Sequence, residues 1–115
     1  MKSKKLSEKI LRSIKSNGFN NIVLDPVLET KYILQRSGEN FKKLLFSFYD
    51  LNGNELCLRP DLTISSAIRF IQNKKLKREK IFYSGEAFRK TYQKKDSIIK
   101  NQIGYEILAS KNKQK

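Results

Sequence analysis

The stretch FKKLLFSFYDLNGNELCLRPDLT, residues 41–63, carries the clearest structural signal in this 115-residue sequence. Apolar side chains alternate along residues 41–50 and again along residues 55–59, which is the period of a half-buried β-strand. Asn52 and Gly53 lie between the two runs, and an Asn-Gly pair there favours a tight turn in which both central residues have positive φ. The stretch therefore predicts an antiparallel hairpin.

Downstream of the hairpin, the pattern predicts a helix and then a second pair of strands. Pro60 ends the preceding strand, and residues 62–73 have apolar side chains at helical spacing. After a lysine-rich connector come two β-prone runs, residues 81–91 and 98–109, separated by the polar segment 92–97. We expect these two runs to pair as a hairpin with an exposed loop.

Upstream of the hairpin, we expect a helix, a short strand and another helix. Residues 5–16 form an amphipathic pattern that ends at Asn17 and Gly18, two residues suited to a left-handed helix end. A β-prone run at residues 22–24 stops at Pro26, and residues 27–36 return to helical spacing.

The order of these elements predicts an α+β domain in which an antiparallel sheet is flanked by helices. At this length one domain is expected, and we assign it to residues 1–110. Residues 111–115 (KNKQK) are predicted to be a disordered basic tail.

The composition excludes several classes of function. The chain has 25 Lys+Arg, 11 Asp+Glu, no His and a single Cys, for a net charge of +14. Without histidine, His-based triads and His-ligated zinc sites are excluded, and we predict neither a metal nor a cofactor. Cys57, which alternates with apolar residues, is expected to be a small buried hydrophobe. We find no signal peptide or membrane span and expect a soluble cytoplasmic protein.

The positive charge predicts a lysine shell rather than a specific nucleic-acid site. Lysine is much commoner than arginine, the side chain favoured for bidentate phosphate and base contacts. The excess lies in residues 1–16, 74–80, 89–100 and 111–115, around a slightly acidic centre. Weak electrostatic attraction to RNA follows from such a shell, so a basic RNA-binding module stays an alternative function.

Two polar residues open the helix after Pro60, and each has a structural and a functional interpretation. Asp61 and Thr63 are suited to cap the helix, because both residue types accept hydrogen bonds from its first N–H groups. The functional alternative is that the carboxylate and hydroxyl bind a ligand ammonium group.

Gln102, Gly104 and Glu106 are spaced by two and therefore share one face of the last strand. Gly104 leaves room above the sheet, either for a ligand or as part of a bulged polar edge. Arg89 is suited to pair with Glu106 or to bind a carboxylate or phosphate. Together with Asp61, these residues predict a polar pocket that suits an amino-acid ligand.

Residues 17–109 resemble the catalytic core of class II aminoacyl-tRNA synthetases, and among them the histidyl branch. The resemblance lies in NGFNNIVLDPVLET, FSFYDLNGNELCLRPDLT, KIFYSGEAFRKT and NQIGYEIL, in that order. The form RPDLT is more similar to the synthetase paralogue that serves as the regulatory subunit of ATP phosphoribosyltransferase, the first enzyme of histidine biosynthesis. The resemblance implies a six-stranded antiparallel sheet flanked by helices, and a homo-oligomer interface around the first motif, which contains Pro26.

The resemblance also implies roles for five residues. Asp61 and Thr63 match the residues that hold the α-amino group of histidine. Arg89 matches the second-motif arginine on the carboxylate and phosphate side of the ligand, and Gln102 and Glu106 match residues that line the amino-acid pocket.

Two departures from the family pattern predict that the chain is not an enzyme. Thr91 stands where an acidic residue that helps to hold adenine is expected, and the sequence ends before the third-motif arginine that would neutralise developing phosphate charge. We therefore expect a partial core with no catalytic residues, a regulatory subunit that binds free histidine and associates with the catalytic subunit of ATP phosphoribosyltransferase. A truncated histidyl-tRNA synthetase core with residual histidine or ATP binding is the alternative.

Overall fold

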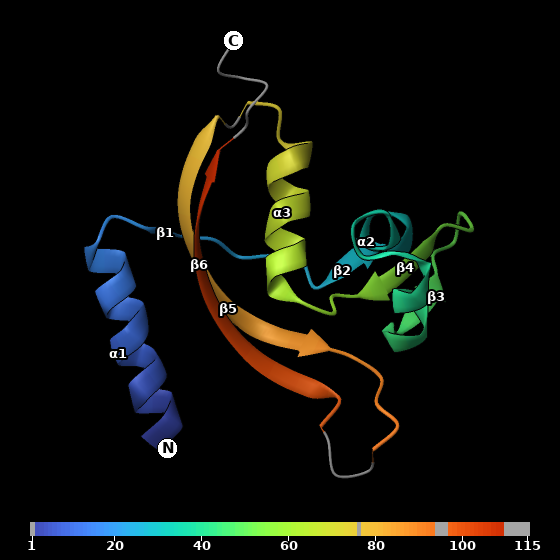
Figure 1. Ribbon diagram of the computed structural model, residues 1–115, viewed down its shortest axis with the longest axis horizontal. Helices are drawn as coiled ribbons and strands as arrows, with labels where there is room; N and C mark the ends of the chain where they lie inside the picture. Colours follow the sequence, from blue (N-terminus) through green and yellow to red (C-terminus); the bar gives the residue numbers. More distant parts are fainter. Residues whose placement is uncertain (1, 76, 94–96, 110–115) are drawn as a thin grey trace.

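The computed structural model describes residues 2–75, 77–93 and 97–109, with side chains from residue 8 onward (Figure 1). The predicted tail 111–115 and the centre of the predicted loop 92–97 lie outside the described residues. In chain order the elements are α1 (Lys2–Ser16), β1 (Asn20–Asn21), β2 (Val27–Glu29), α2 (Thr30–Ser37), the 3₁₀ helix η1 (Glu39–Leu44), β3 (Ser47–Tyr49), β4 (Glu55–Leu58), α3 (Leu62–Gln72), β5 (Arg78–Phe88) and β6 (Ile99–Ala109).

A long antiparallel hairpin, β5–β6, is the largest feature of the fold and confirms the second predicted pair of strands. Its register places Tyr83 opposite Gly104. β1 adds to the other edge of β5 in parallel, with Asn20 opposite Ile81. Figure 1 shows α3 and the second sheet on one side of this hairpin and α1 on the other. The polar face of β6 that carries the predicted site residues is therefore turned toward α3.

The hairpin predicted over residues 41–59 forms as β3 and β4, but its turn differs from the prediction. Phe48 lies opposite Leu56, and β2 pairs with the other edge of β4. Gly53 has φ +83°, as the predicted turn requires. Among the described residues only glycines have positive φ, so Asn52 does not adopt the second positive φ of that turn. Instead, Oδ1 of Asp50 accepts hydrogen bonds from the N–H groups of Asn52 and Asn54, each at 2.9 Å. A carboxylate-capped loop replaces the two-residue turn.

Three other local predictions are corrected. Val27–Glu29 forms strand β2 rather than the first turn of a helix, which begins only at Thr30. The parallel strand β1 is Asn20–Asn21, ahead of the β-prone residues 22–24. The segment Glu39–Leu44 is a 3₁₀ helix, so the alternating run is a strand only from Ser47 to Tyr49.

The described strands form two three-stranded sheets, β1-β5-β6 and β2-β4-β3, rather than one six-stranded sheet. The two sheets meet at prolines, which have no N–H to continue a ladder. Arg59 N–H donates to Pro26 C=O at 2.9 Å at the end of the β2–β4 ladder, and Phe88 N–H donates to Arg59 C=O at 2.9 Å. Arg59 therefore links the sheets through its backbone. The predicted α+β class, with antiparallel sheet and flanking helices, is confirmed.

Helix α3 joins the two halves of the hydrophobic core. Its Leu62 packs with Leu24, Ile81 and Tyr83 against the long hairpin, while its Ile68 packs with Ile33, Leu45 and Cys57 against the second sheet. Because α3 contributes to both clusters, the position of its first turn is set by both sheets.

Cys57 is fully buried, as predicted, and burial raises the pKa of its thiol.

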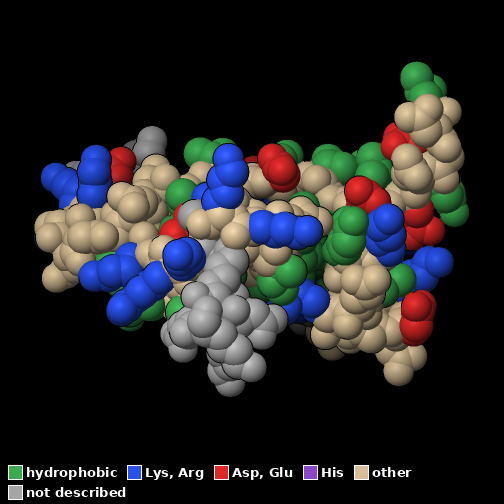
Figure 2. Space-filling view, turned by 90° about the horizontal axis from the view of Figure 1, so that it is seen from above, with side chains coloured by type: hydrophobic (Ala, Val, Ile, Leu, Met, Phe, Trp, Pro, Cys, Tyr) green, Lys and Arg blue, Asp and Glu red, His purple; other side chains and the backbone are tan. Residues whose placement is uncertain are grey.

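On the face of the molecule shown in Figure 2, positive side chains are spread rather than collected in one patch. Lys and Arg side chains lie over several elements of this face, with Asp and Glu side chains between them (Figure 2). None of the described helices is long and apolar enough to cross a bilayer.

Candidate functional site

The first turn of α3 is capped by Asp61. Its backbone is extended, with φ −165°, and its Oδ1 accepts hydrogen bonds from Thr63 N–H at 2.7 Å and Ile64 N–H at 3.2 Å. These are N–H groups that the helix itself cannot satisfy. The prediction that Asp61 caps the helix is therefore confirmed. The capping hydrogen bonds use only one of its two carboxylate oxygens, Oδ1.

The other oxygen of Asp61 faces Arg89, which follows strand β5. Arg89 Nη2 lies 2.9 Å from Asp61 Oδ2, and Arg89 Nε donates to Pro60 C=O at 2.8 Å. The guanidinium also lies over the ring of Phe41, 5.4 Å from its centroid. The structural partner expected for Arg89 was Glu106, but the structure pairs Arg89 with Asp61 instead. Two-fifths of the Arg89 side chain stays exposed, so a ligand anion can reach it.

Gln102 and Glu106 share the face of β6 that is turned toward α3, as their spacing predicts. Gln102 Oε1 accepts a hydrogen bond from Leu62 N–H at 2.9 Å, and Glu106 Oε2 accepts one from the hydroxyl of Ser66. Thr63 lies between them on the helix, and its hydroxyl is 3.2 Å from the hydroxyl of Tyr83.

Sequence reasoning missed Tyr83 and Ser66, which connect these residues. The ring of Tyr83 lies directly over Gly104, where an added Cβ would be 2.7 Å from three of its atoms. The space above Gly104 is therefore filled by Tyr83 and not by a ligand. Burial, together with a smaller effect of the nearby Glu106 carboxylate, raises the pKa of Tyr83. The signal for Tyr83 was its position opposite Gly104, which becomes visible only once the register is known.

The five predicted residues thus form two adjoining groups along the first two turns of α3. Asp61, Arg89 and Gln102 surround the helix start. Thr63, in the same first turn, contacts Tyr83, and Glu106 is bonded to Ser66 one turn further on. The first group presents a carboxylate beside a guanidinium, the pair that complements a zwitterion. The second offers a carboxylate and hydroxyls as hydrogen-bond partners. In the described part of the chain, no cluster of three or more acidic, cysteine or histidine residues could hold a metal.

A cavity of about 300 Å³ adjoins the first group. Its lining includes Arg89, Gln102 and Thr91 and the cations Lys90 and Lys100. Three positive side chains around one opening favour an anionic ligand group.

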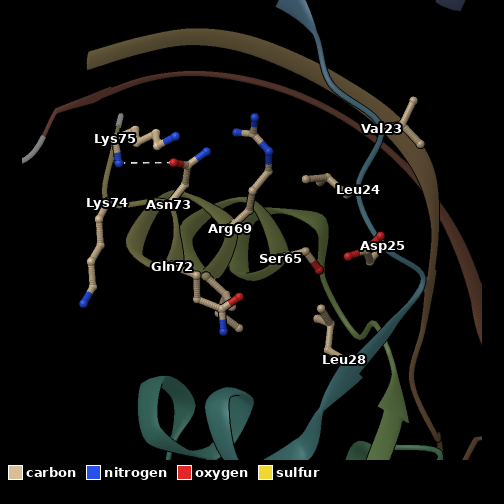
Figure 3. Close-up of a pocket in the computed structure, with 11 residues that line it drawn as sticks. Val23, Leu24, Asp25, Leu28, Ser65, Arg69, Gln72, Asn73, Lys74 and Lys75 are labelled. Carbon is tan, nitrogen blue, oxygen red and sulfur yellow. Dashed lines mark hydrogen bonds between the residues drawn. The ribbon is translucent and has the colours of Figure 1, made fainter. Parts of the chain in front are cut away.

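A larger cavity, of about 580 Å³, lies on another flank of α3 (Figure 3). Val23, Leu24 and Asp25 on one side of it face Ser65, Arg69 and Gln72 of the helix. None of the five predicted residues lines this larger cavity, and Arg69 is already held by Glu79 through bonds of 2.8 and 2.9 Å.

Comparisons with known proteins agree with this fold. A family model described as histidyl-tRNA synthetase matches residues 1–115. The histidine–tRNA ligase of Methanococcus aeolicus is 35% identical over 117 residues, which cover 97% of this chain and 28% of the relative. That of Pyrococcus horikoshii is 39% identical over 85 residues, covering 71% of this chain and 20% of the relative.

Among solved structures, an ATP phosphoribosyltransferase regulatory subunit/histidyl-tRNA synthetase from Bacillus halodurans superimposes with a TM-score of 0.72. It is 22% identical and covers 90% of this chain and 27% of its own. The pyrrolysyl-tRNA synthetase of Desulfitobacterium hafniense has a TM-score of 0.67 at 18% identity, covering 88% and 37%. At these identities the two structures establish a shared fold.

The chain spans between about a fifth and just over a quarter of these curated relatives. Its fold is that of a class II aminoacyl-tRNA synthetase-like core. Because a single family model matches it from end to end, the chain belongs to the histidyl-tRNA synthetase family.

Proposed function

We propose that this chain binds free histidine without activating it, and that it acts as a regulatory-subunit-like partner of the catalytic subunit of ATP phosphoribosyltransferase. The observation that carries the proposal is the Asp61–Arg89 ion pair at the start of α3, with Glu106 one turn further along. The ion pair has the two charges that complement an amino acid, and Glu106, held by Ser66, is a third polar group.

To bind a zwitterion, the contact between Arg89 and Asp61 breaks and each side chain binds one charge of the ligand. Oδ1 of Asp61 is occupied by backbone N–H groups, but Oδ2 is bonded to Arg89 alone among the described residues. A ligand ammonium group at Oδ2 and a ligand carboxylate at the guanidinium exchange one charge-assisted contact for two. Thr63, which is exposed, adds a hydroxyl beside the ammonium group.

The imidazole of histidine finds its partner in the second group. A carboxylate that faces a ring N–H accepts a strong hydrogen bond, and Glu106 is the acid on this face of β6. Ser66 and Tyr83 hold Glu106 in position, because the hydroxyl of Ser66 donates to it and Tyr83 packs beside it.

Thr91 supports the non-catalytic part of the proposal. It lies two residues after Arg89, in the lining of the smaller cavity, and carries no charge. In the enzymes that the sequence resembles, an acidic residue at this position helps to hold adenine. A neutral residue there weakens binding of the ATP that adenylate formation requires.

Calorimetry with free histidine tests the binding site. We expect heat on titration of the wild type, and Glu106→Ala to weaken binding about tenfold or more, since a hydrogen bond to a charged group contributes about 1.5–3 kcal/mol. Glu86→Ala is the matched control, because Glu86 is an exposed acid on the opposite face of the same hairpin. Equal loss in both variants, or no heat at all, would remove the proposed site.

Histidinol, which lacks the carboxylate, tests the role of Arg89. The wild type should bind histidine more tightly than histidinol, and Arg89→Gln should lose that preference. A preference that survives in Arg89→Gln would place the carboxylate elsewhere.

A pull-down with the ATP phosphoribosyltransferase catalytic subunit tests the regulatory role separately. The proposal expects a complex, with a change in the activity of the catalytic subunit or in its inhibition by histidine. Absence of both would end the regulatory role while leaving histidine binding to be judged by calorimetry.

A second candidate function is a synthetase core with residual adenylation. It is favoured by the names of the curated relatives, which are histidine–tRNA ligases at 35% and 39% identity. Histidine-dependent pyrophosphate exchange separates the two functions. We expect none above the level of an Arg89→Gln control, and measurable exchange would favour the synthetase function.

A further inference from the structure

The dipeptide Asn-Gly occurs twice in the chain, each time in exposed backbone. Asn17-Gly18 follows helix α1, and Asn52-Gly53 lies in the loop between β3 and β4. Gly18 and Gly53 have φ of +86° and +83°. In each dipeptide the glycine N–H donates to the carbonyl three residues earlier, at 3.1 Å. The two dipeptides therefore match in sequence, exposure and backbone hydrogen bonding.

The two asparagine side chains differ in what holds them. Nδ2 of Asn17 donates to the C=O of Ser13 at 2.7 Å, which fixes the carboxamide against the last turn of α1. Within the described part of the chain, the carboxamide of Asn52 has no hydrogen-bond partner. No described atom would lie within 4 Å of a Cβ added to Gly53, beyond the glycine and its chain neighbours. The Asn52 side chain is therefore free to turn toward the backbone nitrogen of Gly53.

We propose that Asn52 is a site of spontaneous deamidation and that the fold protects Asn17 from the same reaction. The backbone nitrogen of Gly53 loses its proton and attacks Cγ of Asn52. The new C–N bond closes a cyclic imide, and the side-chain nitrogen takes up the proton and leaves as ammonia. Water is the co-reactant and opens the imide at either carbonyl. The product is an aspartate or an isoaspartate, in which the chain continues through the side-chain carboxyl carbon.

The glycine in the attacking position favours this reaction. It has no side chain to crowd the carboxamide, and its backbone reaches conformations that are closed to other residues. Asn54, by contrast, is followed by Glu55, and its Nδ2 is held by Oδ2 of Asp50 at 3.2 Å. Within the loop, the reaction is therefore specific to Asn52.

Asp50 slows the reaction in the folded protein. Its C=O accepts the Gly53 N–H at 3.1 Å, and its Oδ1 accepts the N–H groups of Asn52 and Asn54 at 2.9 Å each. The attacking nitrogen must leave its hydrogen bond in a loop that the carboxylate holds in place. The negative charge of Asp50 also opposes the loss of a proton from Gly53, because a second anion would form beside it. Removing this carboxylate should therefore speed the modification.

Modification weakens the end of the β3–β4 hairpin. The aspartate product adds a carboxylate two residues from Asp50, and like charges repel. The isoaspartate product adds one carbon to the backbone before Gly53, which shifts the Gly53 N–H away from the C=O of Asp50. The loop joins Tyr49 to Glu55, which lie opposite each other, so this pair should separate first.

Peptide mass spectrometry of the aged protein tests the proposal. The folded protein is incubated in mildly alkaline buffer, where more backbone amide is deprotonated, and far-UV circular dichroism confirms that it stays folded. Trypsin places the two asparagines on different peptides, because Lys31 and Lys43 lie between them. Asn52 should be modified about fivefold faster than Asn17, the factor that one net hydrogen bond contributes.

The same chain unfolded in guanidinium chloride is the control. Both asparagines then lose their hydrogen bonds and are followed by an unhindered glycine, so the two rates should become nearly equal. Equal rates in the folded protein, or modification of Asn52 only after unfolding, would overturn the proposal. A ratio that persists in the unfolded chain would show that flanking sequence, and not the fold, protects Asn17.

Asp50→Ala tests the restraint on the loop. The variant should raise the rate at Asn52 severalfold and leave the rate at Asn17 unchanged. Asp25→Ala, at an exposed acid outside the hairpin, is the matched control and should change neither rate. An Asn52 rate that stays at or below the wild-type value in Asp50→Ala would overturn the role of Asp50, whereas the comparison of Asn52 with Asn17 does not depend on this variant.

Discussion

At the scale of single residues, Gly104 is the most constrained position of the site. An added Cβ would lie 2.7 Å from the ring of Tyr83, which is itself buried and hydrogen-bonded to Thr63. We expect Gly104→Ala to lower the free energy of unfolding by about 1–3 kcal/mol, the cost of overpacking a core. Urea denaturation measures it. Asn101→Ala, an exposed change on the same strand, should cost far less, and equal costs would contradict the close contact.

Tyr83 also gives the site a pH dependence. Burial raises the pKa of Tyr83 in the folded protein above that in the unfolded chain, so the folded state keeps the phenol proton to higher pH. This contribution to stability is complete below the unfolded pKa and is lost as pH rises through the folded pKa. From about pH 9 upward, as pH passes the ordinary tyrosine pKa of about 10, unfolding free energy should therefore fall more steeply in the wild type than in Tyr83→Phe.

Titrating lysines affect both proteins in that comparison and cancel from the difference. Tyr92→Phe, at an exposed tyrosine, should leave the wild-type slope unchanged. A Tyr83→Phe slope equal to that of the wild type would mean that burial of the phenol does not affect stability.

These residues show what single-position reasoning can reach. Asp61 as a helix cap, and Gln102 and Glu106 on one face of a strand, follow from local rules and are confirmed by their contacts. The partner of Arg89 and the role of Tyr83 depend on which residues lie opposite each other in the β5–β6 hairpin. Register is a property of two segments together, so spacing within either segment does not determine it.

At the scale of elements, α3 depends on Asp61 in two separable ways. Asp61→Asn keeps a good capping residue but removes the charge that pairs with Arg89, whereas Asp61→Ala removes both. We expect the alanine variant to lose about 1–2 kcal/mol of stability and the asparagine variant clearly less, as measured by chemical denaturation. If the two variants lost equal stability, the cap would contribute nothing beyond the ion pair.

The failed helix prediction at Val27–Glu29 has a clear physical cause. Val27–Glu29 has apolar residues at a spacing that also fits a helix, and only three residues decide between the two states. Pairing with β4 overrides local preference there, with Leu28 opposite Cys57. The eleven-residue strands and the helix Leu62–Gln72 were predicted because long periodic patterns outweigh such tertiary effects.

At the scale of the whole molecule, the two sheets are coupled through a few backbone contacts and one helix. Arg59 bonds Pro26 on one sheet and Phe88 on the other, and its guanidinium donates to Leu24 C=O and Glu86 C=O. The fold class followed from the order of elements, but the division into two sheets did not. The division into two sheets occurs near prolines, which lack the N–H group that a ladder needs. A proline in the sequence predicts where a strand ends but not where the next sheet begins.

The net charge of +14 leads to a prediction about nucleic acids at this same scale. Because the positive side chains are spread over several elements, as Figure 2 shows, RNA should bind through phosphates and without sequence preference. In fluorescence anisotropy titrations, a histidine tRNA and an unrelated tRNA should bind equally, and log K should fall linearly with log salt. A marked preference for the histidine tRNA that survives at high salt would instead indicate a specific RNA site.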